Sequence, residues 1–201
     1  MDQSTVTPGP PPPPTALPWE AGSPTPQAFL RTLIAIIARP RQALAAPAQA
    51  GWPRALLYTA LVWLLVFVLR YLLFALFSPR PLFNLNAVLG GLLAYLSMAA
   101  VFLALYNGAV LLALRLQGAG AAAAPWPAVL RAVCYSQTSY LAVLVPMVGL
   151  MIHLVWCVVL LSQALVLGLG LARKAALRAA AVPMALFLAL WVLSTWLALR
   201  G

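Results

Sequence analysis

Few side chains in this sequence could carry out chemistry inside a membrane. The chain has two acidic residues, Asp2 and Glu20, and both precede every long apolar segment. A carboxylate proton relay or a two-carboxylate hydrolase needs acids beside the reacting groups, and a Ser-His-Asp arrangement needs one acid. The residue types therefore argue against these mechanisms, and we expect a protein that is not an enzyme.

His153 and Cys157 form the best candidate for a metal site. They stand four residues apart in one apolar segment, a spacing that places two ligands on one face of a helix. A complete site needs more donors at that depth, but we expect Cys134 toward the cytoplasmic end of its segment and His153 toward the outer end. We therefore interpret His153 as a hydrogen-bonded histidine, and we expect no metal, no other cofactor and no disulfide.

The polar stretch CYSQTSY, residues 134–140, interrupts the apolar half of the chain. At about 100° per residue its polar groups point all round a helix, so no side remains for lipid. Unpaired amides and hydroxyls are costly in hydrocarbon, so this helix should be central and should bond its neighbours or water. Three interpretations stay open: packing contacts between helices, a partner or lipid site, and the lining of a solute path. If either of the first two interpretations holds, Gln137→Leu should weaken association with a partner or destabilise the bundle.

The composition indicates whether the segments that position these residues lie in water or in lipid. Of the 201 residues, 7% are charged and 65% are hydrophobic, and the mean hydropathy is +1.00. A chain with this few charged residues cannot cover a water-exposed surface. We therefore expect it to lie in lipid. The formal net charge of +10 does not indicate nucleic acid, because the basic residues are spread between apolar runs.

The pattern predicts an all-α, polytopic membrane helix bundle with five transmembrane helices, preceded by a short interfacial amphipathic helix. A crossing needs roughly 20 apolar residues, and residues 51–201 hold five such segments in one membrane domain. Pro146 and Gly149 mark a very tight turn between the third and fourth. The predicted crossings are 55–77, 87–116, 126–145, 148–170 and 180–199.

Two regions precede this domain. Residues 1–26 are rich in proline and are predicted to be a disordered cytoplasmic tail. Residues 27–50 contain an amphipathic segment that is too short to span, with arginines that could face anionic lipid. We expect this segment to lie in the interface, and the alternative is a helix packed on the bundle. Its apolar face consists of Phe29, Leu30, Leu33, Ile34, Ile36 and Ile37.

The basic residues predict the orientation. Cytoplasmic loops carry an excess of Lys and Arg, and five crossings place the two termini on opposite sides. With the N-terminus in the cytoplasm, nine of the twelve basic residues lie inside and only Arg70, Arg80 and Arg200 lie outside. We therefore expect the N-terminus in the cytoplasm and the C-terminus outside. The nine are Arg31, Arg39, Arg41, Arg54, Arg115, Arg131, Arg173, Lys174 and Arg178.

A contact surface for other helices is also predicted. Small residues recur every fourth position at Ala100, Ala104 and Gly108, and such spacing lets two membrane helices approach closely. Together with the polar stretch and the turn, they make the candidate helix-contact or partner face. This face consists of Ala100, Ala104, Gly108, Tyr135, Ser136, Gln137, Tyr140, Pro146, Gly149 and Trp156.

Several short motifs resemble the Yip1 family of five-span membrane proteins, in its bacterial form. They are PWE at 18–20, AFLRTLIAIIARP at 28–40, Tyr135-Ser136, then Pro146, Gly149 and Trp156, and RKA at 173–175, where related sequences start their last cytoplasmic turn. The resemblance covers residues 18–195. The chain departs from the pattern at Ser139, where proline is frequent, and at Asn107, where histidine is common.

The resemblance implies a place in membrane organisation rather than a reaction. Eukaryotic members look like trafficking proteins that interact with Rab GTPases, whereas bacterial members have no agreed activity. We expect a non-enzymatic scaffold or interaction protein of a bacterial inner membrane, in contact with anionic lipid and with a membrane-protein partner or a second copy. The alternative is a subunit of a small-solute transporter or channel, with the third helix lining the path.

Overall fold

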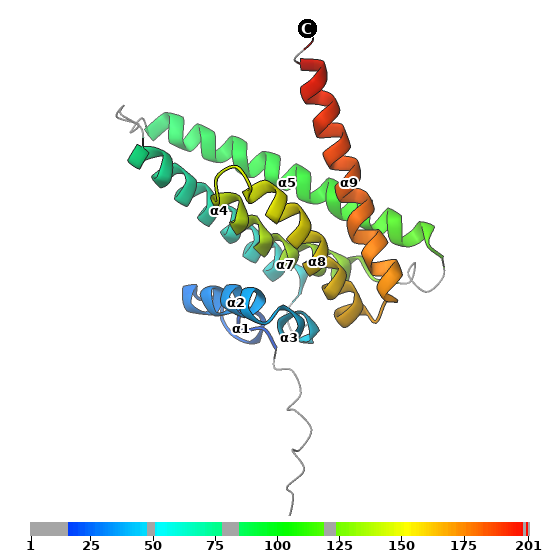
Figure 1. The fold of residues 1–201 in the computed structure, drawn as a ribbon. Helices are drawn as coiled ribbons and strands as arrows, with labels where there is room; N and C mark the ends of the chain where they lie inside the picture. Colours follow the sequence, from blue (N-terminus) through cyan, green and yellow to red (C-terminus); the bar gives the residue numbers. More distant parts are fainter. Residues whose placement is uncertain (1–15, 48–50, 78–84, 119–123, 199, 201) are drawn as a thin grey trace, which may run out of the picture.

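The computed structural model describes residues 16–47, 51–77, 85–118, 124–198 and 200 (Figure 1). Within these ranges the secondary structure is helical, which confirms the all-α prediction. The elements are α1 (Pro18–Ala21), α2 (Pro26–Ala38), α3 (Pro40–Ala45), α4 (Trp52–Phe77), α5 (Leu85–Leu116), α7 (Trp126–Ser136), the 3₁₀ helix η1 (Gln137–Leu144), α8 (Gly149–Leu169) and α9 (Arg173–Ala198).

Four helices are long and apolar enough to cross a membrane: α4, α5, α8 and α9. The predicted third crossing falls on α7 and η1, where an α-helix of 11 residues gives way at Gln137 to a 3₁₀ helix of 8 residues. The structure therefore supports a protein with several membrane-spanning helices, but it does not confirm the predicted count of five.

The predicted connection between the fourth and fifth crossings differs from the structure. Helix α9 begins at Arg173, seven residues before the predicted start at 180, so Arg173 and Lys174 lie in its first turn. Only residues 170–172 separate α8 from α9, and Gly170 ends α8 in the left-handed conformation (φ 66°) that glycine adopts without strain. Most of the predicted connection between the first and second crossings, including Arg80, lies at 78–84, outside the described residues.

The turn predicted at Pro146 and Gly149 is confirmed. Residues 145–148 join η1 to α8, and Gly149 is the first residue of α8. A Cβ atom at Gly149 would collide with the carbonyl oxygen of Ala142, so the hairpin closes this tightly only with glycine there. Met147, at the tip, has a positive φ of 65° and is exposed.

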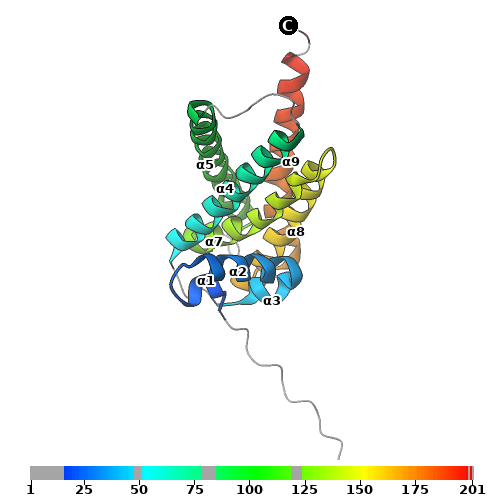
Figure 2. The ribbon, with the colours of Figure 1, turned by 90° about the vertical axis from the view of Figure 1, so that its left-hand side faces the viewer.

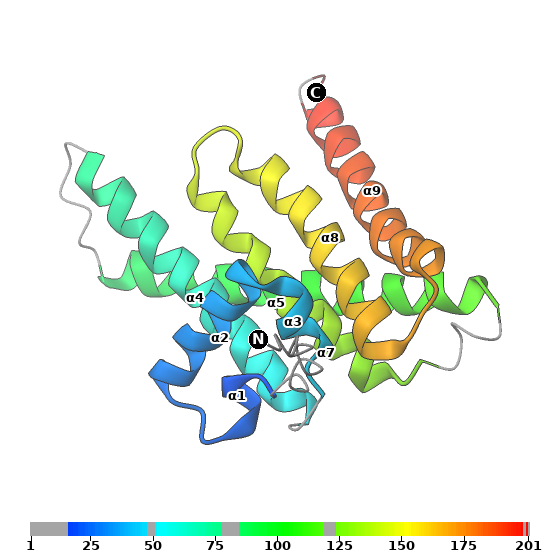
Figure 3. The same cartoon turned by 60° about the horizontal axis from the view of Figure 1, so that its bottom comes forward.

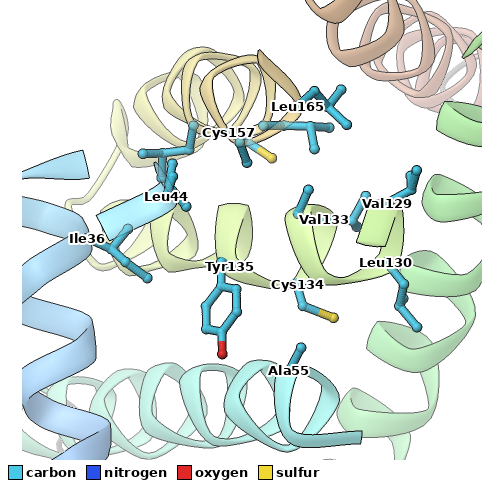
Figure 4. Close-up of a cluster of buried hydrophobic side chains, with 14 of the residues drawn as sticks. Ile36, Leu44, Ala55, Val129, Leu130, Val133, Cys134, Tyr135, Cys157 and Leu165 are labelled. Carbon is cyan, nitrogen blue, oxygen red and sulfur yellow. The ribbon is translucent and has the colours of Figure 1, made fainter. Parts of the chain in front are cut away.

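The α7 and η1 segment is central, as its polar side chains predicted. It packs against α4 and α8, and α7 also contacts α5. Figure 4 shows the α7 side chains Val133, Cys134 and Tyr135 between α4, α8 and α2. The side chains of Val133 to Ser139 are all buried, so lipid has no access to this part of the chain.

The N-terminal helices cover one end of the bundle. Helices α1, α2 and α3 lie at the end where α4, α7 and α9 begin, whereas the last turns of α9 lie at the opposite end (Figures 1 and 2). Figure 3 shows α2 and α3 lying across this end of the bundle. The predicted cytoplasmic end is therefore the end covered by α1–α3.

The prediction of a disordered tail to residue 26 is wrong for its last part. Residues 1–15 lie outside the described residues, but Leu17, Trp19 and Glu20 are buried in the bundle. Trp19 and Glu20 form hydrogen bonds with residues that lie 13 to 115 positions away along the chain. Local composition could not predict these contacts, because the prolines restrict only the backbone next to them and do not indicate contacts with distant residues.

Helix α2 has two apolar faces instead of one. Three apolar side chains, Phe29, Leu33 and Ile36, pack into the core. The polar side chain of Thr32 is buried with them. The remaining apolar side chains of α2 are exposed on the adjacent face: Leu30, Ile34 and Ile37. One face of α2 therefore packs on the bundle, as the alternative interpretation predicted, and the adjacent face is exposed. The position of this exposed face in a membrane interface stays a prediction.

Candidate functional site

The structure brings Trp19 and Glu20 into the bundle through a set of polar contacts that we call the N-terminal clasp. The clasp consists of Trp19, Glu20, Arg54, Arg131 and Tyr135. The Trp19 backbone N–H donates to Thr32 Oγ1 at 2.9 Å, and its indole Nε1–H donates to the carbonyl oxygen of Arg54 at 2.8 Å. These bonds fix α1 against both α2 and α4.

The carboxylate of Glu20 is the centre of the clasp. Arg131 donates from Nε to Oε1 at 2.6 Å and from Nη2 to Oε2 at 3.0 Å, a two-pronged ion pair that matches the planar shapes of both groups. The Tyr135 hydroxyl donates to Oε1 at 2.9 Å. Because Glu20 is 4% exposed, the ion pair is removed from water and depends on all of these donors.

The sequence interpretation missed this role of Glu20. It placed the residue in a tail before every span, but the fold returns the side chain to α7. The available signal was the PWE motif: an acid and a tryptophan are unusual in a proline-rich segment. The carboxylate has an ion-pair partner and a hydroxyl donor, an arrangement that suits a structural anchor.

The polar stretch forms hydrogen bonds with α4. Tyr58 and Thr138 share a hydrogen bond of 2.8 Å between their hydroxyls, and Thr59 donates to the carbonyl oxygen of Cys134 at 3.1 Å. Both bonds are buried. They join two helices through buried polar groups, and Thr59 Oγ1 also lies 3.1 Å from the carbonyl oxygen of Ala55 in its own helix. Such contacts are expected for polar packing between membrane helices.

A second set of bonds connects the polar stretch to α8. The Ser139 hydroxyl donates to the carbonyl oxygen of Ser136 at 2.8 Å, and His153 Nδ1 lies 2.9 Å from Ser139 Oγ. Cys157 Sγ lies 3.6 Å from Ser136 Oγ. His153 and Cys157 thus bond different serines, which confirms the prediction of a hydrogen-bonded histidine. Within the described ranges, no cluster of three or more His, Cys, Asp or Glu could hold a metal.

Serine hydroxyls also accompany the change from α-helix to 3₁₀ helix. Ser136 donates to the carbonyl of Val133 at 2.7 Å, and Ser139 donates to that of Ser136, in each case three residues back. Such bonds compete with the regular α-helical pattern. A 3₁₀ helix of 8 residues is unusually long, and a stretch of this kind within a helix is often found at functional positions.

Gln137 is the exception in the polar stretch. It is 1% exposed, yet its Nε2 atom has no hydrogen-bond partner among the described residues. It lines a cavity of about 470 Å³, within the usual size range of small-molecule sites. The hydroxyl of Tyr95, which lines the same cavity close to the Tyr140 side chain, is also buried without a hydrogen-bond partner among the described residues. The cavity therefore combines a largely apolar wall with two unused polar groups.

The cavity lies where the long segments meet. Its wall includes residues of α4, α5, η1, α8 and α9, and aromatic side chains form much of it. Phe102 and Phe187 face each other with ring centroids 5.2 Å apart, and Tyr140 meets the His153 ring edge-on at 5.1 Å. The aromatic members of the lining are Trp63, Tyr95, Phe102, Tyr140 and Phe187.

The structure separates the predicted contact face into distinct regions. Tyr135 belongs to the clasp, Ser136 bonds Cys157, and Gln137 and Tyr140 line the cavity. Pro146 and Gly149 form the turn, and Trp156 packs half-buried against the core. The small-residue stripe Ala100, Ala104 and Gly108 lies apart from all of these, exposed along α5.

No protein-family model, no curated protein and no solved structure matches this chain. The resemblance to the Yip1 family therefore rests on the short motifs alone.

Proposed function

We propose that the chain is a non-enzymatic, five-span scaffold or interaction protein of a bacterial inner membrane, as the resemblance to the Yip1 family implies. The observation that supports this choice is that most of the polar stretch is buried and that its buried hydroxyl groups are hydrogen-bonded within the protein. Cys134 to Ser139 are buried, and the hydroxyls in this range bond α1, α4, α8 or the helix itself. Side chains lining a solute path would need to face water instead.

The proposed fifth crossing is the α7 and η1 segment. Eleven α-helical residues at about 1.5 Å each and eight 3₁₀ residues at about 2.0 Å each give roughly 32 Å. A bilayer core is about 30 Å thick, so the segment is long enough to cross it. The α-helical part of this segment has only 11 residues, which is why the number of long apolar helices is four among the described residues.

The proposed orientation has α1–α3 on the cytoplasmic side. The bases expected there include exposed side chains in α2, α3 and the first turn of α9, such as Arg31, Arg41 and Arg173. They would meet anionic headgroups while Leu30, Ile34 and Ile37 enter the interface. A tag on residue 201 should then be digested by protease added outside spheroplasts, and protection of this tag would contradict the orientation.

The proposed contact surface for a second copy is the exposed stripe on α5. An Ala104→Ile change adds bulk to the stripe and should reduce co-purification of two differently tagged copies. Ala94→Ile is the matched control, because Ala94 is exposed on the same helix but off the stripe. Equal co-purification of both variants and the wild type would argue against this surface.

The transporter alternative makes a different prediction for the polar stretch. If the scaffold proposal holds, cysteines at Ser136 and Ser139, placed in a chain without Cys134 and Cys157, should remain unlabelled by a charged, membrane-impermeant thiol reagent. Both positions are buried and bonded, so the reagent has no route to them. Labelling of both cysteines in intact membranes would favour a water-filled path and overturn the scaffold proposal.

A further inference from the structure

The cavity beside Gln137 has the features of a site for a neutral ligand. Among the residues that line it there is no Asp, Glu, Lys or Arg side chain, and the histidine in the lining, His153, already bonds Ser139 through Nδ1. A charged ligand placed there would lose its hydration without gaining a counter-ion, which is unfavourable at the depth of a bilayer core. The wall thus selects against carboxylates, phosphates and amines.

The unused polar groups specify what the ligand must carry. Gln137 Nε2 is a donor, and the Tyr95 hydroxyl can donate or accept. A hydrocarbon chain filling the cavity would leave both groups unpaired in an apolar medium. An oxygen atom that accepts a hydrogen bond, as in an alcohol or a ketone, would satisfy Gln137, and a hydroxyl could satisfy either group.

The rim indicates that the ligand comes from the membrane. Met98 of α5 and Leu150 of α8 line the cavity and are exposed, so its outer edge is apolar. Gln137 lies deep in the wall, near the middle of the α7 and η1 segment. A molecule entering past Met98 would therefore move from hydrocarbon to an aromatic wall, and its polar end would meet Gln137.

We infer that this cavity binds a neutral, lipid-soluble molecule with a long hydrocarbon chain and one hydroxyl or carbonyl oxygen. The oxygen accepts a hydrogen bond from Gln137 Nε2 and lies near the Tyr95 hydroxyl. The chain packs against Phe102, Phe187 and the other aromatic side chains of the wall. This site is separate from the α5 stripe proposed to bind a second copy, so either proposal can fail without the other.

Photolabelling of the full chain in a non-ionic detergent tests the site. The probe is hexadecanol with a diazirine in its chain, and the adducts are mapped by mass spectrometry. We expect adducts on cavity residues, and competition by unlabelled hexadecanol but not by hexadecane or hexadecanoate. Hexadecane lacks the oxygen, and hexadecanoate brings a charge.

Matched variants separate the cavity from the rest of the surface. Ala99→Phe fills the cavity and should abolish labelling, whereas Ala94→Phe adds the same bulk at an exposed position outside it. Gln137→Leu and Tyr95→Phe should each weaken competition by hexadecanol, Gln137→Leu by about three- to tenfold. Gln163→Leu is the control, because Gln163 Oε1 is also unpaired but lies outside this cavity.

Two results would overturn the inference. Hexadecane competing as well as hexadecanol would show that the cavity takes any acyl chain. Equal labelling of the Ala99→Phe and Ala94→Phe variants would show that the probe binds elsewhere. If Ala99→Phe does not fold, Tyr95→Phe decides the question, because it keeps the ring and removes only the hydroxyl.

Discussion

The N-terminal clasp and the Gln137 cavity both contain buried polar groups. These groups are hydrogen-bonded in the clasp, whereas, in the part of the chain that the structure describes, two of them are unpaired beside the cavity. In the clasp, Glu20 accepts hydrogen bonds from Arg131 and Tyr135 on both carboxylate oxygens. Beside the cavity, Gln137 Nε2 and the Tyr95 hydroxyl have no partner among the described residues. The first arrangement is complete within the protein, whereas the second is the one from which we infer a bound molecule.

A small cavity beside the clasp strengthens this contrast. It has a volume of about 100 Å³ and lies between α3, α7 and α8, next to Arg131 and Tyr135. Arg131 already donates to Glu20 and to the carbonyl oxygen of Ala46. Arg131 and Tyr135 therefore already bond groups of the protein. The position of a cavity is thus less informative than the state of the polar groups in its wall.

The largest expected effect comes from breaking the ion pair of the clasp. Arg131→Leu leaves the Glu20 carboxylate buried without its cation and should destabilise the protein by about 3 to 5 kcal/mol, or by less if α1 undocks into water. Thermal unfolding in detergent measures the loss, and limited proteolysis at residues 16–25 reports undocking. Arg178→Leu, which removes an exposed cation, is the control and should have little effect. Similar melting of both variants would mean that the clasp does not stabilise the fold.

A smaller loss is expected when the clasp loses only a hydroxyl. Tyr135→Phe keeps the ring against Tyr58 but removes the donor to Glu20, a bond to a charged group worth about 1.5 to 3 kcal/mol. A double-mutant cycle with Glu20→Gln measures the coupling between the two residues. A coupling energy near zero would show that the hydroxyl is not bonded to the carboxylate in the protein.

The neutral bond between α4 and η1 should contribute less again. Tyr58→Phe removes the hydroxyl that bonds Thr138, and we expect a loss of about 1 kcal/mol in the free energy of unfolding. The same cycle with Thr138→Val isolates this bond from the packing of the ring. If the two changes are additive, then the helices are held by packing alone at this position.

The smallest effect on stability is expected at Gln137. Because Nε2 has no partner among the described residues, Gln137→Leu should change the free energy of unfolding by less than about 0.6 kcal/mol, or raise it. This revises the expectation from sequence, in which the amide supports the bundle. A loss as large as that of Tyr58→Phe would show that the amide is bonded within the protein. The contrast between clasp and cavity would then disappear.

Much of the fold could be predicted from residue types and their order. The long apolar runs gave α4, α5, α8 and α9 their approximate positions, and the polar stretch predicted that the third segment is central. Gly149 and Pro146 predicted the turn. The end of α7 at Ser136 could not be predicted, because hydroxyl bonds to Val133 and Ser136 carbonyls tighten the helix there.

The candidate sites were less predictable than the fold. Gln137 and Tyr140 were recognised as polar residues in a membrane helix, but their cavity depends on side chains from four other helices. Tyr95 was not identified at all, since one tyrosine in an apolar run has no local signal. Glu20 was assigned to a tail because its partners lie more than 100 positions further along the chain.

By itself, the sequence determined that this protein is built for lipid, since 7% charged residues cannot cover a water-exposed surface. It also determined the approximate positions of α4, α5, α8 and α9, because hydropathy and backbone propensity act over neighbouring residues. Only the tertiary structure decided which polar groups find partners. Hydrogen bonds and ion pairs depend on ångström distances between distant segments, so the closed clasp and the unpaired amide of Gln137 became visible only in the folded chain.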